Sequence, residues 1–290
     1  MKRREFISRS AIAAGTVMLP AWLQACTTAS RKSIGLQLYT LRDVIFQDLR
    51  GTLEKVAGFG YTEVETFSYG DGKIFGQPFS DFVKMTRDMG LKVTSGHYLT
   101  GFGQKATGTL RNGWEKAVED AKAAGQEYMV IAYLFDGERQ SLDDYKRLCA
   151  EMNKAAEVCK AAGIRLGYHN HAFEFEPLDG HIPYDVMLAE LDPKLVAMEL
   201  DLYWIVRAGK SPDDYFKKHP GRFELWHVKD MHKDDPAKNA DLGQGKINFP
   251  EIFRQAKQSG MKHFYVEQET YEVSSLVSVE NNYKYISGII

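Results

Sequence analysis

A strand-like apolar segment followed by an amphipathic helix recurs eight times between residues 33 and 290, about every 30 residues. The segments with strand character are 33–41, 61–67, 91–99, 127–134, 164–171, 195–202, 223–230 and 263–270. The helical patterns between and after them begin near Leu49, Ser80, Leu110, Leu142, Tyr184, Pro212, Pro250 and Ser275. This alternation predicts parallel strands joined by crossover helices, and eight such units match one closed (β/α)8 barrel.

Glycines close several of the predicted helices and precede the next strand. They are suited to left-handed caps and are Gly60, Gly90, Gly125, Gly163 and Gly260. No change of composition divides residues 27–290, so we predict a single barrel domain over this range. An open doubly wound sheet is the alternative, and it is disfavoured because no Gly-x-Gly-x-x-Gly turn follows the first strand.

Residues 1–26 have the pattern of a separate export signal. Arg3 and Arg4 precede an apolar run over 11–25, which is of secretory length and too short to span a membrane. The run ends in Leu-Gln-Ala-Cys at Cys26, which resembles a bacterial lipobox. We therefore predict a twin-arginine or lipoprotein-type signal and an exported protein, periplasmic or anchored to the membrane through a lipid at Cys26. An ordinary amphipathic N-terminal helix is the alternative.

Charge argues against a nucleic-acid partner. The formal net charge of the whole chain is −2. Removing residues 1–25 takes away four basic residues and one acidic residue, which makes the net charge −5. No basic block is present that could follow a phosphate backbone. The remaining cysteines, Cys149 and Cys159, lie ten positions apart in one predicted helix, about 15 Å along its axis, so no disulfide joins them.

Polar side chains occupy the C-terminal ends of nearly all the predicted strands, where active sites of such barrels lie. They are Gln37, Tyr39, Glu63, Glu65, His97, His169, His171, Glu199, Asp201, His227, Lys229, Asp230, Glu267 and Glu269. Charged groups are seldom buried unless they are paired or bound to a metal. Carboxylates and imidazoles converging on one rim therefore indicate a divalent metal site.

Strand alternation selects three metal ligands from this set, because residues two apart share a face. Asp201 shares the barrel-facing side with Glu199, while their neighbours are apolar. His227 alternates with Trp226 and Val228 in the same way. With Glu267 on the last strand, these residues are the strongest candidates; the alternative is three unrelated polar residues at strand ends.

These motifs resemble the sugar phosphate isomerase/epimerase group of xylose isomerase-like TIM barrels over residues 33–290. The resemblance rests on Asp201 in Glu-Leu-Asp-Leu-Tyr-Trp, His227 in Trp-His-Val-Lys-Asp, Glu267 in Val-Glu-Gln-Glu, and the Gly-x-Gly loop over 241–249. It implies one Mn²⁺, Co²⁺, Mg²⁺ or Zn²⁺, held by an acid on strand five, Asp201, His227 and Glu267. The group includes ketose 3-epimerases, hydroxypyruvate isomerase, inosose dehydratase and 3-keto-glycoside lyases.

The chain departs from this group at two positions. Strand five carries His169 where an epimerase would have glutamate, so we predict His169 as the fourth ligand, with His171 and Glu174 as alternatives. Trp204 stands where epimerases commonly have histidine. It predicts an apolar platform for a sugar face, with core packing as the alternative.

The resemblance implies chemistry through an enediolate, in which the ion polarises a carbonyl and a base removes the neighbouring proton. Without the strand-five glutamate, a two-sided epimerisation is in doubt, whereas isomerisation or elimination from a 3-keto-glycoside needs one base and one acid. Glu267 is the predicted base, and Lys229, His97 or Glu174 is the predicted acid. The predicted substrate contacts are Gln37, Tyr39, Glu65, His171 and Trp204.

The predicted partner is a small carbohydrate, not phosphorylated, because phosphorylated sugars are cytoplasmic and the rim shows no arginine cluster. A non-catalytic exported sugar-binding barrel is the main alternative function. A three-zinc AP endonuclease shares the fold but needs more ligands and a basic surface. The resemblance also leaves a homodimer open.

Overall fold

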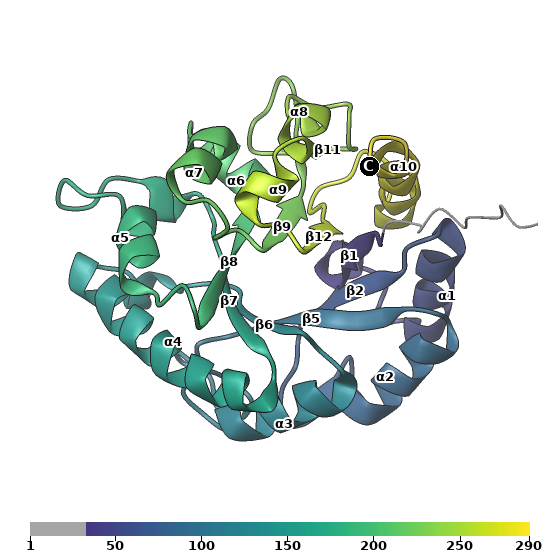
Figure 1. The fold of residues 1–290 in the computed structure, drawn as a ribbon. Helices are drawn as coiled ribbons and strands as arrows, with labels where there is room; N and C mark the ends of the chain where they lie inside the picture. Colours follow the sequence, from purple (N-terminus) through teal and green to yellow (C-terminus); the bar gives the residue numbers. More distant parts are fainter. Residues whose placement is uncertain (1–32) are drawn as a thin grey trace, which may run out of the picture. The chain divides into compact units, whose positions relative to one another are not determined.

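Eight parallel strands close into a barrel in the computed structural model, which describes residues 33–290 (Figure 1). The strands, in order around the barrel, are β1 (Gly35–Gln37), β2 (Glu63–Thr66), β5 (Lys92–Tyr98), β6 (Tyr128–Ile131), β7 (Arg165–His169), β8 (Val196–Asp201), β9 (Leu225–Val228) and β12 (His263–Val266). β12 pairs with β1 and completes the ring. The predicted single barrel is confirmed and the open sheet is wrong. The predicted signal over 1–26 lies outside the described residues.

Helices surround the barrel on its outer side, as Figure 1 shows. They are α1 (Leu49–Phe59), α2 (Phe79–Asp88), α3 (Trp114–Ala124), α4 (Leu142–Ala162), α5 (Pro183–Glu190), α6 (Leu202–Arg207), α7 (Pro212–Lys218), α8 (Phe249–Phe253), α9 (Ala256–Ser259) and α10 (Ser275–Ser287). Short 3-10 turns are η2 (Leu38–Leu41), η3 (Asp136–Glu138) and η4 (Phe173–Phe175). Two hairpins lie in loops, β3 (Lys73–Ile74) with β4 (Gln77–Pro78) and β10 (Asp230–Met231) with β11 (Asn239–Ala240).

Helix boundaries follow the capping residues of the sequence. Asp48 and Ser141 cap α1 and α4 by accepting backbone N–H bonds from the first turn. The helix predicted to begin near Leu110 begins at Trp114 instead, because Gly113 precedes it in the left-handed region at φ 72°. No helix among residues 33–290 is long and apolar enough to cross a membrane.

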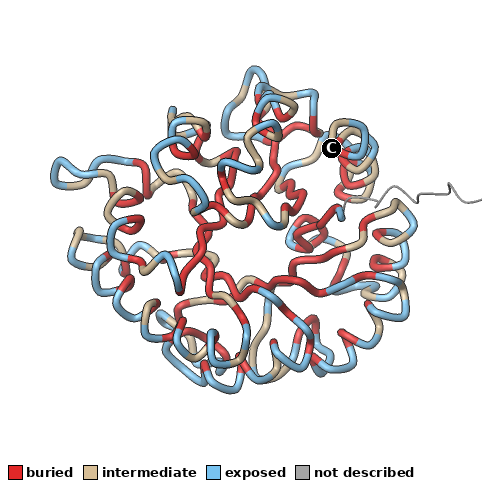
Figure 2. Tube along the Cα trace, viewed as in Figure 1, coloured by how far each residue is buried: buried red, intermediate tan, exposed pale blue. Residues whose placement is uncertain are grey.

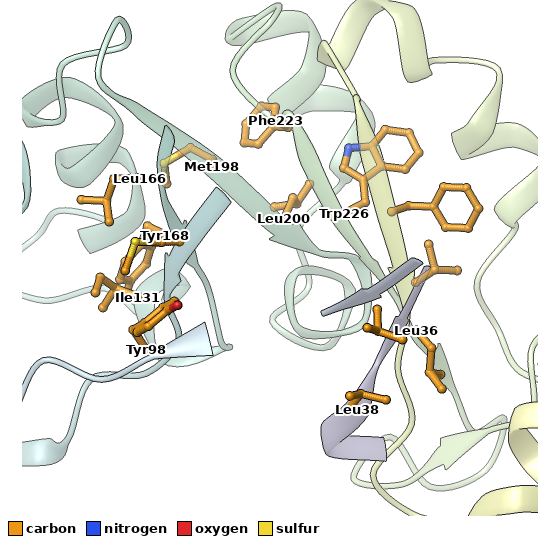
Figure 3. Close-up of a cluster of buried hydrophobic side chains, with 14 of the residues drawn as sticks. Leu36, Leu38, Tyr98, Ile131, Leu166, Tyr168, Met198, Leu200, Phe223 and Trp226 are labelled. Atoms are coloured by element: carbon orange, nitrogen blue, oxygen red, sulfur yellow. The ribbon is translucent and has the colours of Figure 1, made fainter. Parts of the chain in front are cut away.

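The apolar side chains form two layers that follow the alternation of the strands. The large cluster drawn in Figure 3, which includes Leu36, Met198, Leu200 and Trp226, packs between strands and helices. A small cluster inside the barrel contains Tyr128, Val130, Ala197, Leu225 and Tyr265. In Figure 2 the strands are mostly buried, and exposure is concentrated on the outer sides of the helices. Residues that alternate with the large cluster therefore face the barrel axis.

α4 carries both described cysteines. Cys149 and Cys159 are buried in this helix and are unpaired, as the ten-residue spacing predicted. Burial raises the pKa of each thiol to about 12, so both remain protonated at neutral pH. They act as small apolar side chains in the core.

Candidate metal centre and substrate pocket

Four side chains at the C-terminal ends of adjacent strands meet at one point. His169 and Asp201 are the last residues of β7 and β8, His227 is on β9, and Glu267 directly follows β12. One ligand atom from each lies within 4.8 Å of all the others. The structure thus brings together the four residues predicted to hold the metal ion.

The distances within this group fit a single divalent cation. His227 Nδ1 lies 3.0 Å from Glu267 Oε2 and 3.8 Å from Asp201 Oδ2, and His169 Nε2 lies 3.4 Å from Asp201 Oδ2. Ligand atoms bound to one ion at about 2.1 Å are about 3.0–3.4 Å apart in octahedral or tetrahedral geometry. The 3.0 and 3.4 Å distances lie in this range, and the 3.8 Å distance is slightly longer. Two imidazoles and two carboxylates are also a donor set that Zn²⁺, Mn²⁺ or Co²⁺ accepts.

Backbone contacts orient the ligand atoms of Asp201 and His169. Asp201 caps α6, where Oδ1 accepts N–H bonds from Tyr203 at 2.8 Å and Trp204 at 2.9 Å. The other oxygen, Oδ2, is therefore left for the cluster. His169 Nδ1 donates to the carbonyl of Ala132 at 3.2 Å, which leaves the lone pair on Nε2. Burial, together with His227, lowers the pKa of His169 to about 4, so this ring is neutral and able to bind a cation.

The ammonium group of Lys229 balances the negative charge of carboxylates in and beside the four-residue group. Its Nζ lies 3.1 Å from Asp201 Oδ2, 2.6 Å from Glu267 Oε2 and 2.6 Å from Glu269 Oε1. Burial alone would raise the pKa of Asp201, but the Lys229 ammonium brings it to about 2. Lys229 itself is fully buried and does not line the pocket described below. The structure therefore gives it a charge-compensating position.

A second cluster lies beside His227 and involves Glu65, His97 and Glu199. Glu65 Oε1 is 2.6 Å from His227 Nε2, and Glu199 Oε2 is 2.8 Å from His97 Nε2. Burial opposes a charge on His97, but the two carboxylates raise its pKa to about 9, so the ring is an imidazolium at neutral pH. Burial, followed by the charge of Glu65, raises the pKa of Glu199 to about 7.

A pocket of about 1030 Å³ opens above the four-residue group. The predicted residues that line it are Tyr39, His97, His169, His171, Trp204 and Glu267. The rings of His171 and Trp204 lie 5.2 Å apart, and His171 stacks on Phe173 at 5.5 Å. The pocket therefore has a polar floor at the candidate metal centre and an aromatic wall beside it.

Besides Lys229, three predicted contact or acid residues lie away from this pocket. Gln37 and Glu65 are fully buried and do not line it; Gln37 Nε2 donates to Glu65 Oε1 at 2.7 Å. Glu174 is fully buried on η4, where its carboxylate accepts from Tyr168 Oη at 2.7 Å and from the His171 backbone N–H at 2.8 Å. These contacts hold the turn that carries His171.

We expect Glu174→Gln to reduce the dependence of stability on pH. Burial raises the pKa of Glu174 to about 7, so the folded protein keeps a proton that the unfolded chain releases near pH ~4.3. The stability from this group is present below that pH and is lost as the pH rises to about 7. The fall in thermal midpoint between pH 5 and pH 8 should be smaller in the variant than in wild type. The exposed Glu119→Gln should behave as wild type, and an equal fall in both variants would contradict the assignment.

Several pocket residues were not predicted from the sequence. Tyr133 follows β6, the strand whose end has no charged residue, and its ring lies 5.0 Å from that of His171. Arg207 and Lys210 also line the pocket, and the Arg207 guanidinium lies 4.9 Å from the Trp204 ring centroid. Arg207 is the last residue of α6, and Lys210 lies three residues beyond it. The sequence signal for these cations was this position shortly after the Asp201 motif.

The fold and the site together define a (β/α)8 barrel protein with a metal-type donor set at its C-terminal face. A family model described as xylose isomerase-like TIM barrel matches residues 53–287, and the chain belongs to this family.

Solved structures and a curated relative are similar to the chain over different lengths. Two structures from Parabacteroides distasonis ATCC 8503, each described as a sugar phosphate isomerase/epimerase, are 31% and 29% identical, with TM-scores of 0.78 and 0.77. The matches cover 88% and 93% of this chain and 97% and 98% of those chains. An inosose dehydratase of Geobacillus kaustophilus (strain HTA426) is 26% identical over 162 residues, 56% of this chain and 49% of that protein. The chain thus matches about half the length of this curated relative.

Proposed function

We propose that this protein is a divalent-metal-dependent enzyme that acts through an enediolate on a non-phosphorylated sugar or keto-sugar. The observation that carries the proposal is the meeting of His169, Asp201, His227 and Glu267 at the floor of a large pocket. The reaction we favour is β-elimination from a 3-keto-glycoside, with aldose–ketose isomerisation as the other reaction that one base can support.

Glu267 is the base in this proposal. Its Oε2 is occupied by His227 and Lys229, whereas Oε1 makes no hydrogen bond with the described residues, and the side chain lines the pocket. When bound, the divalent ion would polarise a substrate carbonyl and acidify the adjacent C–H. Glu267 Oε1 can then take that proton from C2 of a 3-keto-glycoside.

His97 is the acid. Of the three predicted acids, only His97 lines the pocket, and its imidazolium form can donate a proton. In the elimination, the C2–H electrons pass first to the carbonyl and then form the C1–C2 double bond, while the C1–O bond breaks. The departing oxygen takes a proton from His97, which yields an alcohol and an unsaturated keto-sugar. No oxidant or reductant is consumed.

A full epimerisation is less well supported by the site. It requires a second proton-transfer group on the opposite face of the substrate. The corresponding position on β7 is His169, which lies 3.4 Å from Asp201 and belongs to the donor group. A reaction that removes one proton and expels one group fits these residues better.

The pocket supports a substrate larger than a single sugar. A volume of about 1030 Å³ is just above the range of roughly 300–1,000 Å³ that holds drug-sized ligands. Tyr39, Tyr133, Phe173 and Trp204 line it, and aromatic rings of this kind pack against apolar faces. We propose that the sugar lies at the ion and that the aglycone contacts this aromatic wall.

The place of the reaction is proposed from residues 1–26. The twin-arginine and lipobox pattern supports export and a lipid anchor at Cys26. A substrate outside the cytoplasm is consistent with a glycoside rather than a phosphorylated intermediate.

The proposal is tested by incubating metal-loaded protein with 3-keto-glucosides, simple ketoses and phosphorylated ketoses. We expect turnover of the keto-glucosides, loss of turnover after chelation, and recovery when Mn²⁺, Co²⁺ or Zn²⁺ is added. Turnover that is unaffected by chelator would contradict the metal mechanism. Binding of sugars without turnover of any substrate would favour the non-catalytic sugar-binding protein.

A further inference from the structure

The Glu65 carboxylate contacts side chains from three other strands, β1, β5 and β9, in the interior of the barrel. Its Oε1 accepts from Gln37 Nε2 at 2.7 Å and lies 2.6 Å from His227 Nε2. Its Oε2 accepts from Ser95 Oγ at 2.6 Å. Gln37, Glu65, Ser95 and His227 are all fully buried. Glu65 Oε1 also lies 3.2 Å from His97 Nε2. Both oxygens of this carboxylate are therefore held in place by neutral groups of the scaffold as well as by two histidines.

The two ring nitrogens of His227 point to different partners. Nε2 lies against Glu65, while Nδ1 lies 3.0 Å from Glu267 Oε2, on the side of the candidate metal centre. A carboxylate can only accept from this ring, so without an ion each nitrogen donates to its carboxylate. An ion bound on the Glu267 side would displace the Nδ1 proton, while the Nε2 proton would stay with Glu65. Histidines that bind metals usually donate their other N–H in this manner.

We propose that Glu65 is a positioning residue that holds His227 with its proton on Nε2 and its Nδ1 directed at the metal ion. The inference deepens the proposed function and rests on it. It replaces the substrate contact predicted for Glu65, because the carboxylate does not line the pocket and each of its oxygens already has a donor within the barrel.

A second ion among Glu65, His97, Glu199 and His227 is the competing explanation, since their ligand atoms also lie within 4.8 Å of one another. Such an ion would have to take the His227 Nε2 proton and turn the ring into a bridge between two metals. Gln37 and Ser95 already supply neutral donors to Glu65, which suits a hydrogen-bond acceptor. One ion per chain is therefore expected.

The test compares Glu65→Gln with Glu63→Gln. Glu63 is two positions earlier on β2 and pairs with His263 Nδ1 at 2.7 Å, so the control removes a similar carboxylate–histidine pair away from the metal centre. The Co²⁺ affinity of the full chain is measured by competition with a chromophoric chelator. We expect Glu65→Gln to bind Co²⁺ about 10–100-fold more weakly and the control to stay within about threefold of wild type.

The His227 ring gives a second measurement that a purely structural role would not change. In zinc-loaded, ¹⁵N-labelled protein, its Nε2 proton should resonate far downfield in wild type and in Glu63→Gln, and should move upfield in Glu65→Gln. Glu65→Asp should recover part of the Co²⁺ affinity. Equal affinity in wild type and Glu65→Gln, or two Co²⁺ per wild-type chain falling to one in the variant, would overturn the inference. Failure of wild type to bind any Co²⁺ would instead refute the proposed function.

Discussion

Glu267→Gln is expected to lower kcat on a 3-keto-glucoside by about 10²–10⁴-fold, the range over which a positioned acid or base accelerates a reaction. The variant keeps the size of the side chain but removes the carboxylate that takes the α-proton. The same carboxylate is also a predicted metal ligand, with Oε2 at 3.0 Å from His227 and 2.6 Å from Lys229. The substitution therefore removes both the base and one ligand of the ion.

Two measurements separate these roles. Saturating Mn²⁺ should restore metal content in Glu267→Gln while kcat remains low. In D₂O, wild type should exchange the substrate α-proton and the variant should not. The matched control is Glu176→Gln, which removes an exposed carboxylate from the pocket wall, outside the donor group. If kcat recovers fully with added metal, Glu267 is a ligand only and the base must be sought elsewhere.

The sequence was sufficient to predict which face each ligand takes. Asp201 and His227 alternate with Leu200, Trp226 and Val228, and the structure places these apolar residues in the cluster between strands and helices. A period of two follows from the pleat of a strand and needs no knowledge of neighbouring strands. The barrel and three of the four converging residues, Asp201, His227 and Glu267, could therefore be predicted from one chain. The fourth, His169, came from the family resemblance, with His171 and Glu174 as alternatives.

Depth along the barrel axis could not be predicted in this way. Glu65 faces the interior as expected, but it is fully buried below the pocket, and Gln37 lies beside it. Depth depends on the stagger between neighbouring strands, here the pairing of Gln37 with Glu65 across β1 and β2. Alternation within a single strand carries no information about that stagger.

The positions of residues in loops and short turns could not be predicted for a different reason. Glu174 is five positions after His169, but the 3-10 turn η4 directs its carboxylate back to Tyr168. Tyr133 and Phe173 line the pocket from segments without a regular period. Nothing in the local pattern distinguishes such aromatic residues from ordinary core residues.

Lys229→Met is expected to lower the free energy of unfolding by about 3–5 kcal/mol in chelator-treated protein at pH 7, the usual cost of leaving buried charges without a partner. The side chain of Lys229 is 1% exposed, and Nζ contacts carboxylates of Asp201, Glu267 and Glu269. The matched control is Lys284→Met, which breaks an exposed pair with Glu280 and should cost no more than about 1 kcal/mol. Urea unfolding followed by tryptophan fluorescence measures both.

The loss should depend on pH and on metal in a defined direction. In the folded state the pKa of Asp201 is lowered to about 2, and the pKa of Glu267 is held well below its usual range. Burial opposes both shifts, and the charge of Lys229 is their main cause. The stability that these groups contribute is present above their unfolded pKa values, about 4, and is lost as the pH falls through the folded values. The difference between wild type and Lys229→Met should therefore shrink below about pH 4.

Added Zn²⁺ should recover part of the lost stability at pH 7, because a divalent cation supplies the charge that Lys229 no longer provides to Asp201 and Glu267. An ion at 100 times its dissociation constant stabilises the folded state by about 2.7 kcal/mol. If Lys229→Met were equally destabilised with and without Zn²⁺, the ion would not share these carboxylates with the lysine. The ammonium and the ion would then belong to separate sites, and the four-residue centre would not be the place where the cation binds.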